Sequence, residues 1–379
     1  MKVQCCGFHR FGRLRERSPD DHHNHMSSFV PPSLLAAAAA LFLAGTSQAF
    51  GQSTQGVQPA PGQDQAATQE PTIRVNVDLV NIYFTVKAKK GGQLIPNLVK
   101  SNFSISEDGK PQTIEHFSRE TDLPLTLGLL IDISASQERL IDIERDAASA
   151  FFSSVIRPKD EAFLISFGKD TELLQDYTSS PRLLTAALKD LRGDGQTPMV
   201  GGGPIPNVNT GPLPTSGNPK GTLLFDAVYL ASNEKLKTEV GRKALILITD
   251  GEDQGSTYNV KTAIEAAQRS DAIIYSIYYV DRGFYAQGGI MFGGGGGERD
   301  LRKMSEETGG HVFTVSRKQP LNQIFNEIQD ELRNQYSIGY ESTNPKRDGT
   351  FRHIQIKVDN SDYRAQAREG YYATSNGAQ

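Results

Sequence analysis

The sequence predicts an α/β fold: a doubly wound, mostly parallel sheet flanked by a small β-sandwich that N- and C-terminal segments build together. Three observations predict it. Apolar runs of strand length alternate with apolar residues at helical spacing through the middle of the chain. Period-two patterns precede and follow that middle part. Each outer pattern is too short to enclose a core, so we expect the two to pair and close each other's edges.

The first β segment begins at Ile73. Apolar and polar residues alternate from Ile73 to Leu79, and the alternation continues in the opposite parity from Val80 to Val86, which indicates a bulge or a break between faces. Apolar residues on both sides of the Asp108-Gly109 pair then predict a hairpin or a tight β connection. Nothing here has helical spacing, so residues 72–119 are expected to supply a few strands of a sandwich.

The middle of the chain alternates strands and helices. Continuous apolar runs, typical of strands buried on both faces, predict strands at Leu125–Ile133, Phe163–Phe167, Ala244–Thr249, Ala272–Val280 and Val312–Val315. Helical spacing predicts helices at Leu140–Val155, Leu183–Leu191, Leu223–Leu230, Val260–Ala267, Leu301–Thr308 and Leu321–Leu332. This alternation implies a mostly parallel sheet with helices on both faces.

The end of the chain returns to period two. Tyr336–Tyr340 and Ile354–Val358 alternate on either side of the Asp348-Gly349 turn, which predicts further strands. The patterns therefore divide the chain into a leader (1–49), a disordered linker (50–71), a first sandwich part (72–122), an α/β domain (123–334), a second sandwich part (335–373) and a tail (374–379).

The amino-terminal segment predicts export. Leu34–Leu43 is an apolar stretch of signal-peptide length, too short to span a bilayer comfortably, and Ser47-Gln-Ala49 follows it as a cleavage pattern. Met26 is an alternative start, because the residues before it are polar and unlike a leader. We therefore expect a periplasmic or secreted protein whose mature chain has no transmembrane span. Both cysteines, Cys5 and Cys6, precede the apolar stretch, so disulfides cannot stabilise the mature chain.

The charge balance excludes one class of partner. The chain has 40 Lys+Arg and 44 Asp+Glu, and the first 49 residues hold 5 and 3 of these. The remaining residues therefore carry 35 basic and 41 acidic side chains, a net charge of −6. Nucleic-acid binding needs a basic surface, so we expect no nucleic-acid partner.

Hard oxygen ligands occur where the predicted strands end. Asp132-Ile-Ser134-Ala-Ser136 follows the strand Leu125–Ile133, Thr222 begins a helix, and Asp250 follows a second buried strand. Open α/β sheets bind ligands at the carboxyl ends of their strands. Carboxylate and hydroxyl oxygens suit Mg²⁺, with Mn²⁺ as a substitute. The Asp-x-Ser-x-Ser triplet alone is more typical of a solvated turn, and the other two segments favour a metal site.

This order of motifs resembles the metal-ion-dependent adhesion site of von Willebrand factor type A domains, with Asp132, Ser134, Ser136, Thr222 and Asp250 matching it. The resemblance implies that these residues hold a divalent cation, and that an acidic group of a protein or glycan partner completes its coordination. With Glu107–Pro111 before the domain and Arg368–Tyr372 at its end, the layout resembles exported von Willebrand factor A-related proteins of Acidobacteria.

Two glycine-rich insertions interrupt the α/β part, at Gly193–Gly221 and Arg282–Gly297. The first leads directly into Thr222, and the second leaves the rim that carries the predicted metal site. Loops at such a rim carry function on a rigid scaffold, although both insertions are equally compatible with low-complexity filler. The apolar residues expected to contact a ligand are Phe284, Tyr285, Met291 and Phe292.

Three functions compete. The first is a metal-dependent binding module without enzymatic activity. The second is a Mg²⁺-dependent phosphoryl-transfer enzyme, but Asp132-Ile-Ser134 lacks the second carboxylate of an Asp-x-Asp phosphatase, and no His or Lys motif accompanies the serines. The third is a structural envelope protein whose site is idle. The sequence identifies neither the ligand nor the oligomeric state.

Overall fold

A computed structural model of the chain describes residues 79–120, 123–193, 221–281 and 296–373. All of them belong to one unit, residues 73–379. The predicted leader, linker and tail lie outside the described residues, as do residues 73–78 and most of both insertions.

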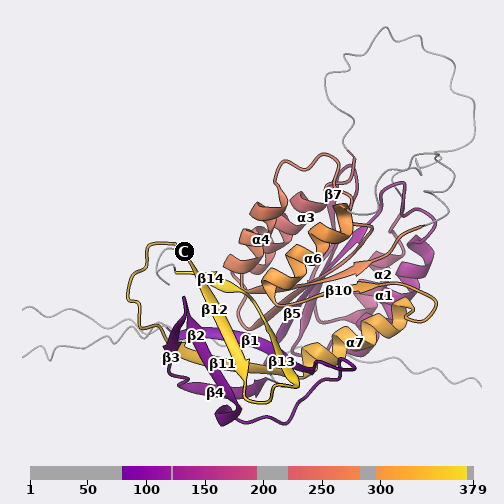
Figure 1. Cartoon of the computed structure of the whole chain (residues 1–379). Helices are drawn as coiled ribbons and strands as arrows, with labels where there is room; N and C mark the ends of the chain where they lie inside the picture. Colours follow the sequence, from indigo (N-terminus) through magenta and orange to yellow (C-terminus); the bar gives the residue numbers. More distant parts are fainter. Residues whose placement is uncertain (1–78, 121–122, 194–220, 282–295, 374–379) are drawn as a thin grey trace, which may run out of the picture. The chain divides into compact units, whose positions relative to one another are not determined.

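A six-stranded sheet forms the centre of the α/β part, in the order β10-β9-β8-β5-β6-β7 (Figure 1). All neighbouring strands are parallel except β6 and β7. Every residue of β5 and β8 is buried, because helices cover both faces of these central strands. The strands are β5 (Leu125–Asp132), β6 (Glu161–Phe167), β7 (Thr171–Thr178), β8 (Arg242–Thr249), β9 (Ala272–Tyr278) and β10 (Val312–Thr314).

Two helical layers enclose the sheet (Figure 1). Side chains of α1 (Ile141–Val155), α2 (Pro181–Leu188) and α7 (Leu321–Arg333) share one apolar core with one face of the sheet. Side chains of α3 (Leu224–Leu230), α4 (Val260–Arg269) and α6 (Gly296–Thr308) share another core with the opposite face. A π-helical stretch, Ala231–Leu236, continues α3.

The outer segments of the chain pair with each other in two antiparallel four-stranded sheets. One has the order β13-β1-β11-β4 and the other β14-β12-β2-β3, and their facing side chains form a third core. The strands are β1 (Leu79–Ala88), β2 (Phe103–Glu107), β3 (Lys110–Gln112), β4 (His116–Glu120), β11 (Gln335–Glu341), β12 (Phe351–Val358), β13 (Tyr363–Ala367) and β14 (Gly370–Tyr372); a 3-10 turn, Lys100–Asn102, precedes β2. Asp108 and Gly109 connect β2 to β3 with φ angles of 47° and 78°.

A buried ionic cluster joins the N-terminal and C-terminal segments that build this sandwich. The Glu107 carboxylate of β2 accepts hydrogen bonds from the hydroxyls of Tyr340 (2.8 Å) and Tyr371 (3.0 Å) and pairs with the Arg352 guanidinium at 3.2 Å. Glu107 and Arg352 are 2% and 3% exposed. The N-terminal segment of the sandwich supplies Glu107 and the C-terminal segment supplies Arg352. Each charge is therefore neutralised only when the two segments pair.

The α/β part is inserted between two neighbouring sandwich strands. β4 precedes β5, and β11 begins at Gln335, two residues after α7 ends at Arg333. Gln335 pairs with Glu120 at the start of the β4–β11 ladder. The two connections to the α/β part therefore leave the sandwich side by side.

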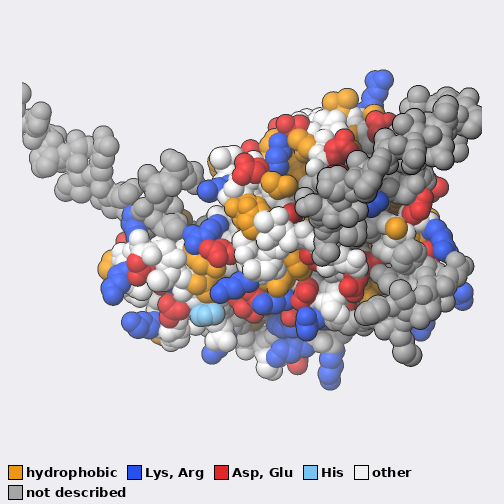
Figure 2. Space-filling model, turned by 90° about the horizontal axis from the view of Figure 1, so that it is seen from above, with side chains coloured by type: hydrophobic (Ala, Val, Ile, Leu, Met, Phe, Trp, Pro, Cys, Tyr) orange, Lys and Arg blue, Asp and Glu red, His pale blue; other side chains and the backbone are white. Residues whose placement is uncertain are grey.

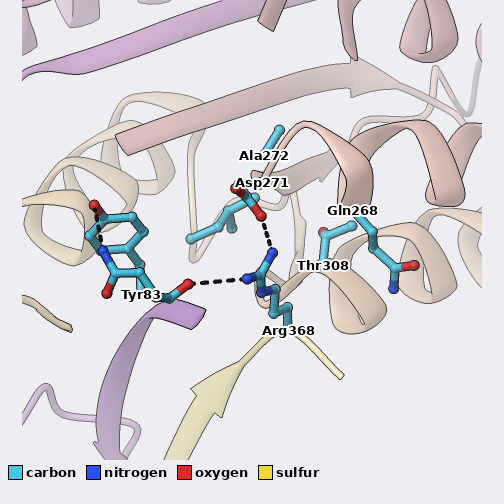
Figure 3. A pocket seen from close by; sticks show the side chains of 8 residues that line it. Tyr83, Gln268, Asp271, Ala272, Thr308 and Arg368 are labelled. Carbon is cyan, nitrogen blue, oxygen red and sulfur yellow. Dashed lines mark hydrogen bonds and ion pairs between the residues drawn. The ribbon is translucent and has the colours of Figure 1, made fainter. Parts of the chain in front are cut away.

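Polar contacts fill the junction between the sandwich and the α/β part. Lys87 of β1 pairs with Glu331 of α7 at 2.6 Å. His311 lies 3.5 Å from Glu331, and its other ring nitrogen lies 3.1 Å from the side-chain amide of Gln366. Arg368 forms an ion pair with Asp271 beside a cavity of about 20 Å³ (Figure 3), a volume large enough for roughly one water molecule.

The predicted fold class is confirmed. The predicted strands and helices of the α/β part are present, with ends that differ by a few residues. Three strands were not predicted: β7 at the edge of the central sheet, and β13 and β14 in the sandwich. In the described part of the chain, no helix is long and apolar enough to cross a membrane.

Candidate metal centre

The turn after β5 holds Asp132 in a fixed orientation. One oxygen of its carboxylate accepts a hydrogen bond from the Ser134 backbone N–H at 2.9 Å. The other accepts from the Thr249 hydroxyl at 2.5 Å, and Thr249 Oγ1 in turn accepts from the Gly251 N–H at 3.0 Å. Asp132 is fully buried. The carboxylate therefore has one orientation, and it keeps lone pairs for a cation or for water on a cation.

The two serine hydroxyls lie at the spacing of neighbouring metal ligands. Ser134 Oγ and Ser136 Oγ are 3.1 Å apart. Octahedral Mg²⁺ with bonds of about 2.1 Å places adjacent ligand oxygens about 3.0 Å apart. The backbone N–H of Gln137 donates to the Ser134 carbonyl at 2.9 Å, which closes the turn that carries both hydroxyls. The pair therefore fits one edge of such an octahedron without rearrangement.

Thr222 is held at the same edge of the sheet by its own backbone and that of its neighbour. The Leu223 N–H donates to the carbonyl of Gly168, directly after β6, at 2.9 Å. The Thr222 carbonyl accepts from the Gln254 N–H, in the loop that follows Asp250, at 2.8 Å. Thr222 is 6% exposed. These bonds fix its position between the end of β6 and the Asp250 loop.

Asp250 follows β8 and is 3% exposed. Its carboxylate accepts a hydrogen bond from the Glu252 N–H at 3.2 Å. Gly251 next to it has a φ of +80°, and Gly297, at the start of α6, packs against this backbone. A Cβ added at Gly297 would lie 2.5 Å from the Asp250 carbonyl oxygen, so only glycine allows this approach.

The buried carboxylates make this region attractive to a cation. Burial, and then the charge of Asp250, raise the pKa of Asp132 to about 7, against the opposing hydrogen bonds from Ser134 and Thr249. A divalent cation between the acids would supply the missing positive charge. In the described residues, no three His, Cys, Asp or Glu side chains are grouped closely enough to hold a metal by themselves. A cation at this edge would therefore need the hydroxyl oxygens as ligands, and hydroxyl and carboxylate oxygens are donors that suit Mg²⁺.

The structure brings the predicted oxygen ligands to one edge of the sheet, at the carboxyl ends of β5, β6 and β8. The predicted ligand contacts Phe284, Tyr285, Met291 and Phe292 lie outside the described residues. Sequence reasoning missed Thr249 and Gly297. Thr249 could have been identified from the sequence, because it directly precedes Asp250 at the end of a predicted strand. Gly297 could not, because the residue that it packs against, Gly251, is distant from it in the sequence.

The cavity of Figure 3 does not belong to this centre. It lies beside Gln268, Asp271 and Thr308, and Ala272, the first residue of β9, also lines it. Asp132 and Asp250 lie at the opposite, carboxyl ends of the parallel strands. The cavity is therefore a feature of the junction with the sandwich.

Residues 215–327 match the von Willebrand factor type A domain. The match includes Thr222 and Asp250 and begins after the turn that carries Asp132, Ser134 and Ser136. The strand that leads into this turn, β5, nevertheless pairs with β8 in the same sheet. No curated protein matches the chain. The closer resemblance to exported acidobacterial proteins stays a prediction.

Several solved structures are similar to the chain. The conserved hypothetical protein BatB of Bacteroides thetaiotaomicron is 16% identical over 55% of this chain and 97% of that chain, with a TM-score of 0.38. A von Willebrand factor type A protein from Catenulispora acidiphila is 12% identical over 73% and 74%, at 0.41. Proximal thread matrix protein 1 from the mussel byssus, solved with a zinc-occupied metal-ion-dependent adhesion site (MIDAS) motif, is 14% identical over 58% of this chain and 49% of that chain, with a TM-score of 0.41. The fold assignment does not depend on these similarities.

Proposed function

We propose that this protein is an exported, metal-dependent binding module of the adhesion type. Its type A domain holds Mg²⁺ with Asp132, Ser134, Ser136, Thr222 and Asp250, and Mn²⁺ is a possible substitute. An acidic group of a protein or glycan partner completes the coordination. The observation that carries the proposal is the pair of serine hydroxyls, 3.1 Å apart, beside two buried carboxylates.

Each residue has a distinct role in this proposal. Ser134 and Ser136 bind the cation directly, and Asp132 and Asp250 bind it directly or through water. Thr222 binds it directly or through water according to the conformational state. Bound Mg²⁺ supplies a Lewis-acidic centre that attracts an anionic oxygen. Hydroxyl ligands add no charge, so a cation held by few carboxylates stays electron-poor. The centre therefore keeps an affinity for one further carboxylate, which the partner supplies.

Specificity must come from the surroundings of the cation, because every protein surface presents Asp and Glu. In our proposal the two insertions, Gly193–Gly221 and Arg282–Gly297, supply it, with Phe284, Tyr285, Met291 and Phe292 as apolar contacts. Exposed aromatic residues at a functional rim are typical binding anchors. On the face shown in Figure 2, acidic and basic side chains are interspersed, which supports a protein or glycan partner over nucleic acid.

Calorimetric titration with Mg²⁺ tests the metal part of the proposal. We expect Ser136→Ala to weaken binding about tenfold or more, which equals about 1.4 kcal/mol. Ser153→Ala is the matched control, because Ser153 is exposed on α1 and its hydroxyl donates only to the Ser149 carbonyl among the described contacts. Unchanged Mg²⁺ affinity in Ser136→Ala would contradict the proposal.

A pull-down from envelope extract, with Mg²⁺ and again with EDTA, tests the binding function. We expect a partner that is retained only with Mg²⁺. This partner should be lost when Arg282–Gly297 is shortened to a tight turn that keeps Gly296 and Gly297, while Mg²⁺ affinity persists. Capture that survives this deletion would show that the insertion is filler. Turnover of phosphate esters with Mg²⁺ would favour the phosphoryl-transfer alternative, and metal binding without any partner would favour the idle structural one.

Amino-terminal sequencing of the protein from cells tests export. We expect the mature chain to begin near Phe50, directly after the Ser47-Gln-Ala49 pattern. An intact Met1 or Met26 on a cytoplasmic protein would overturn this part of the proposal.

A further inference from the structure

The buried face of α1 carries a carboxylate where an apolar residue is expected. The buried residues of this helix recur at helical spacing: Ile141, Glu144, Ala147, Ala148, Phe151, Phe152 and Val155. Glu144 is fully buried among them. A charged side chain in an apolar face destabilises a fold unless another charge or hydrogen-bond donor compensates it.

No donor compensates Glu144 in the described residues. Neither of its carboxylate oxygens has a hydrogen-bond partner. Gln137, also fully buried, donates from its side-chain amide to the Tyr279 carbonyl at 3.2 Å, but its own side-chain oxygen has no partner. Two buried side chains, Gln137 before α1 and Glu144 in its first turn, therefore present three acceptor oxygens that have no hydrogen-bond partner in the described residues.

A short hydrogen-bonded stretch of backbone connects these acceptors to the candidate metal centre. Backbone hydrogen bonds lead from the centre in short steps: Gln137 N–H to Ser134 O (2.9 Å), Leu140 N–H to Gln137 O (2.8 Å) and Glu144 N–H to Leu140 O (3.0 Å). Glu144 thus lies about two turns beyond the serine pair. Burial, then the charges of Asp132 and Asp250, raise the pKa of Glu144, so the field of both acids reaches it.

We propose that Glu144 is a third carboxylate of the metal centre, acting on the bound cation through the protein interior as a charge and not as a ligand. It is not a direct ligand, because the described residues contain no group of three acidic, His or Cys side chains that could share one ion. Charges interact more strongly across a protein interior than across water. A divalent cation at the serine pair then compensates Glu144, and Glu144 in turn strengthens cation binding. This inference rests on the proposed metal site.

Glu144→Gln tests the inference, because glutamine keeps the shape and removes the charge. Asp146→Asn is the matched control: it removes one charge from the same helix, at an exposed position. We expect Glu144→Gln to weaken Mg²⁺ binding about tenfold or more in calorimetric titration, and Asp146→Asn to leave it within about twofold. Without metal, we expect Glu144→Gln to melt at the wild-type temperature or above it, because an uncompensated buried carboxyl is gone.

Three outcomes would overturn the inference. Equal Mg²⁺ affinity in wild type and Glu144→Gln would show that the carboxylate does not act on the cation, and would leave the proposed function intact. A lower melting temperature of metal-free Glu144→Gln, with Glu144→Leu equally destabilised, would show that the carboxylate stabilises the fold without a cation. No Mg²⁺ binding by the wild type would remove the proposed function and this inference together.

Discussion

Replacing Gly297 by alanine tests whether α6 is packed onto the metal centre. A Cβ at this position would lie 2.5 Å from the Asp250 carbonyl oxygen, 2.7 Å from the Gly251 carbonyl carbon and 2.9 Å from the Gly251 carbonyl oxygen. All three are backbone atoms, so no side-chain rotation can relieve the contact. The main chain after Asp250 has to move, and α6 with it.

The neighbouring residue supplies the control. Gly296 lies in the same first turn of α6, and a Cβ added there would meet nothing within 4 Å. Both Gly→Ala changes gain helix propensity, up to about 1 kcal/mol each. Overpacking of a closely packed contact costs about 1–3 kcal/mol. The gain is common to both variants, so Gly297→Ala is expected to be about 1–3 kcal/mol less stable than Gly296→Ala.

Urea unfolding followed by far-ultraviolet circular dichroism measures this difference, since the chain has no tryptophan to report by fluorescence. We also expect Mg²⁺ titration to show weaker binding in Gly297→Ala and wild-type binding in Gly296→Ala. If both variants unfold at the same urea concentration, the close approach of Gly297 to Asp250 is refuted.

Three further predictions concern the sandwich and its junction. Glu107→Leu should lower the free energy of unfolding by about 3–5 kcal/mol, because it leaves the Arg352 guanidinium buried without its partner. Adding Arg352→Leu should recover part of this loss. If urea unfolding shows the same loss in the single and the double variant, the prediction is contradicted. Burial, then the charges of Lys87 and Arg364, lower the pKa of His311 to about 3. Between pH 3 and 6.5 the His311 side chain is therefore protonated in the unfolded chain but neutral in the folded chain, so the wild type loses stability on acidification. The stability difference between wild type and His311→Gln should therefore shrink by roughly 2 kcal/mol from pH 6.5 to 5, whereas a pH-independent difference would argue against it. Deleting Tyr336–Tyr372 removes nearly all of β11 from between β1 and β4 and should cause aggregation, because the sheet edges lose their partners. A soluble product with an unchanged melting transition would exclude this.

The central α/β elements were predictable because their burial is nearly complete. β5 and β8 are buried at every residue, so each contains a run of mostly apolar residues that marks it in the sequence. β7 gives no such signal: it is an edge strand, none of its residues is fully buried, and its pairing with β6 contains register shifts. The short strands β13 and β14 are also half-exposed, and their place depends on partners that lie elsewhere in the chain.

The candidate site was predictable only for the residues that lie in a short sequence motif. The triplet at Asp132, with Thr222 and Asp250, identifies one edge of the sheet because each follows a strand or begins a helix. The Thr249 hydrogen bond to Asp132 was not predictable, because it joins residues 117 positions apart. The Gly297 contact depends in the same way on how α6 lies over β8. Glu144 left a trace in the sequence, as a charged residue within an apolar helical stripe, and the structure shows its burial.

The insertion of the α/β part between β4 and β11 has a consequence for folding. In the unfolded chain, the residues from Glu120 to Gln335 form one long loop, and pairing these two strands requires its closure. Closure of so long a loop costs entropy and slows the pairing. Once the α/β part is folded, its first strand and last helix hold the two ends beside each other, and the loop is already closed. We therefore expect the inserted part to fold first and to bring β4 and β11 together. Any change that delays the central sheet leaves the sandwich strands unpaired for longer, and exposes their edges to other chains.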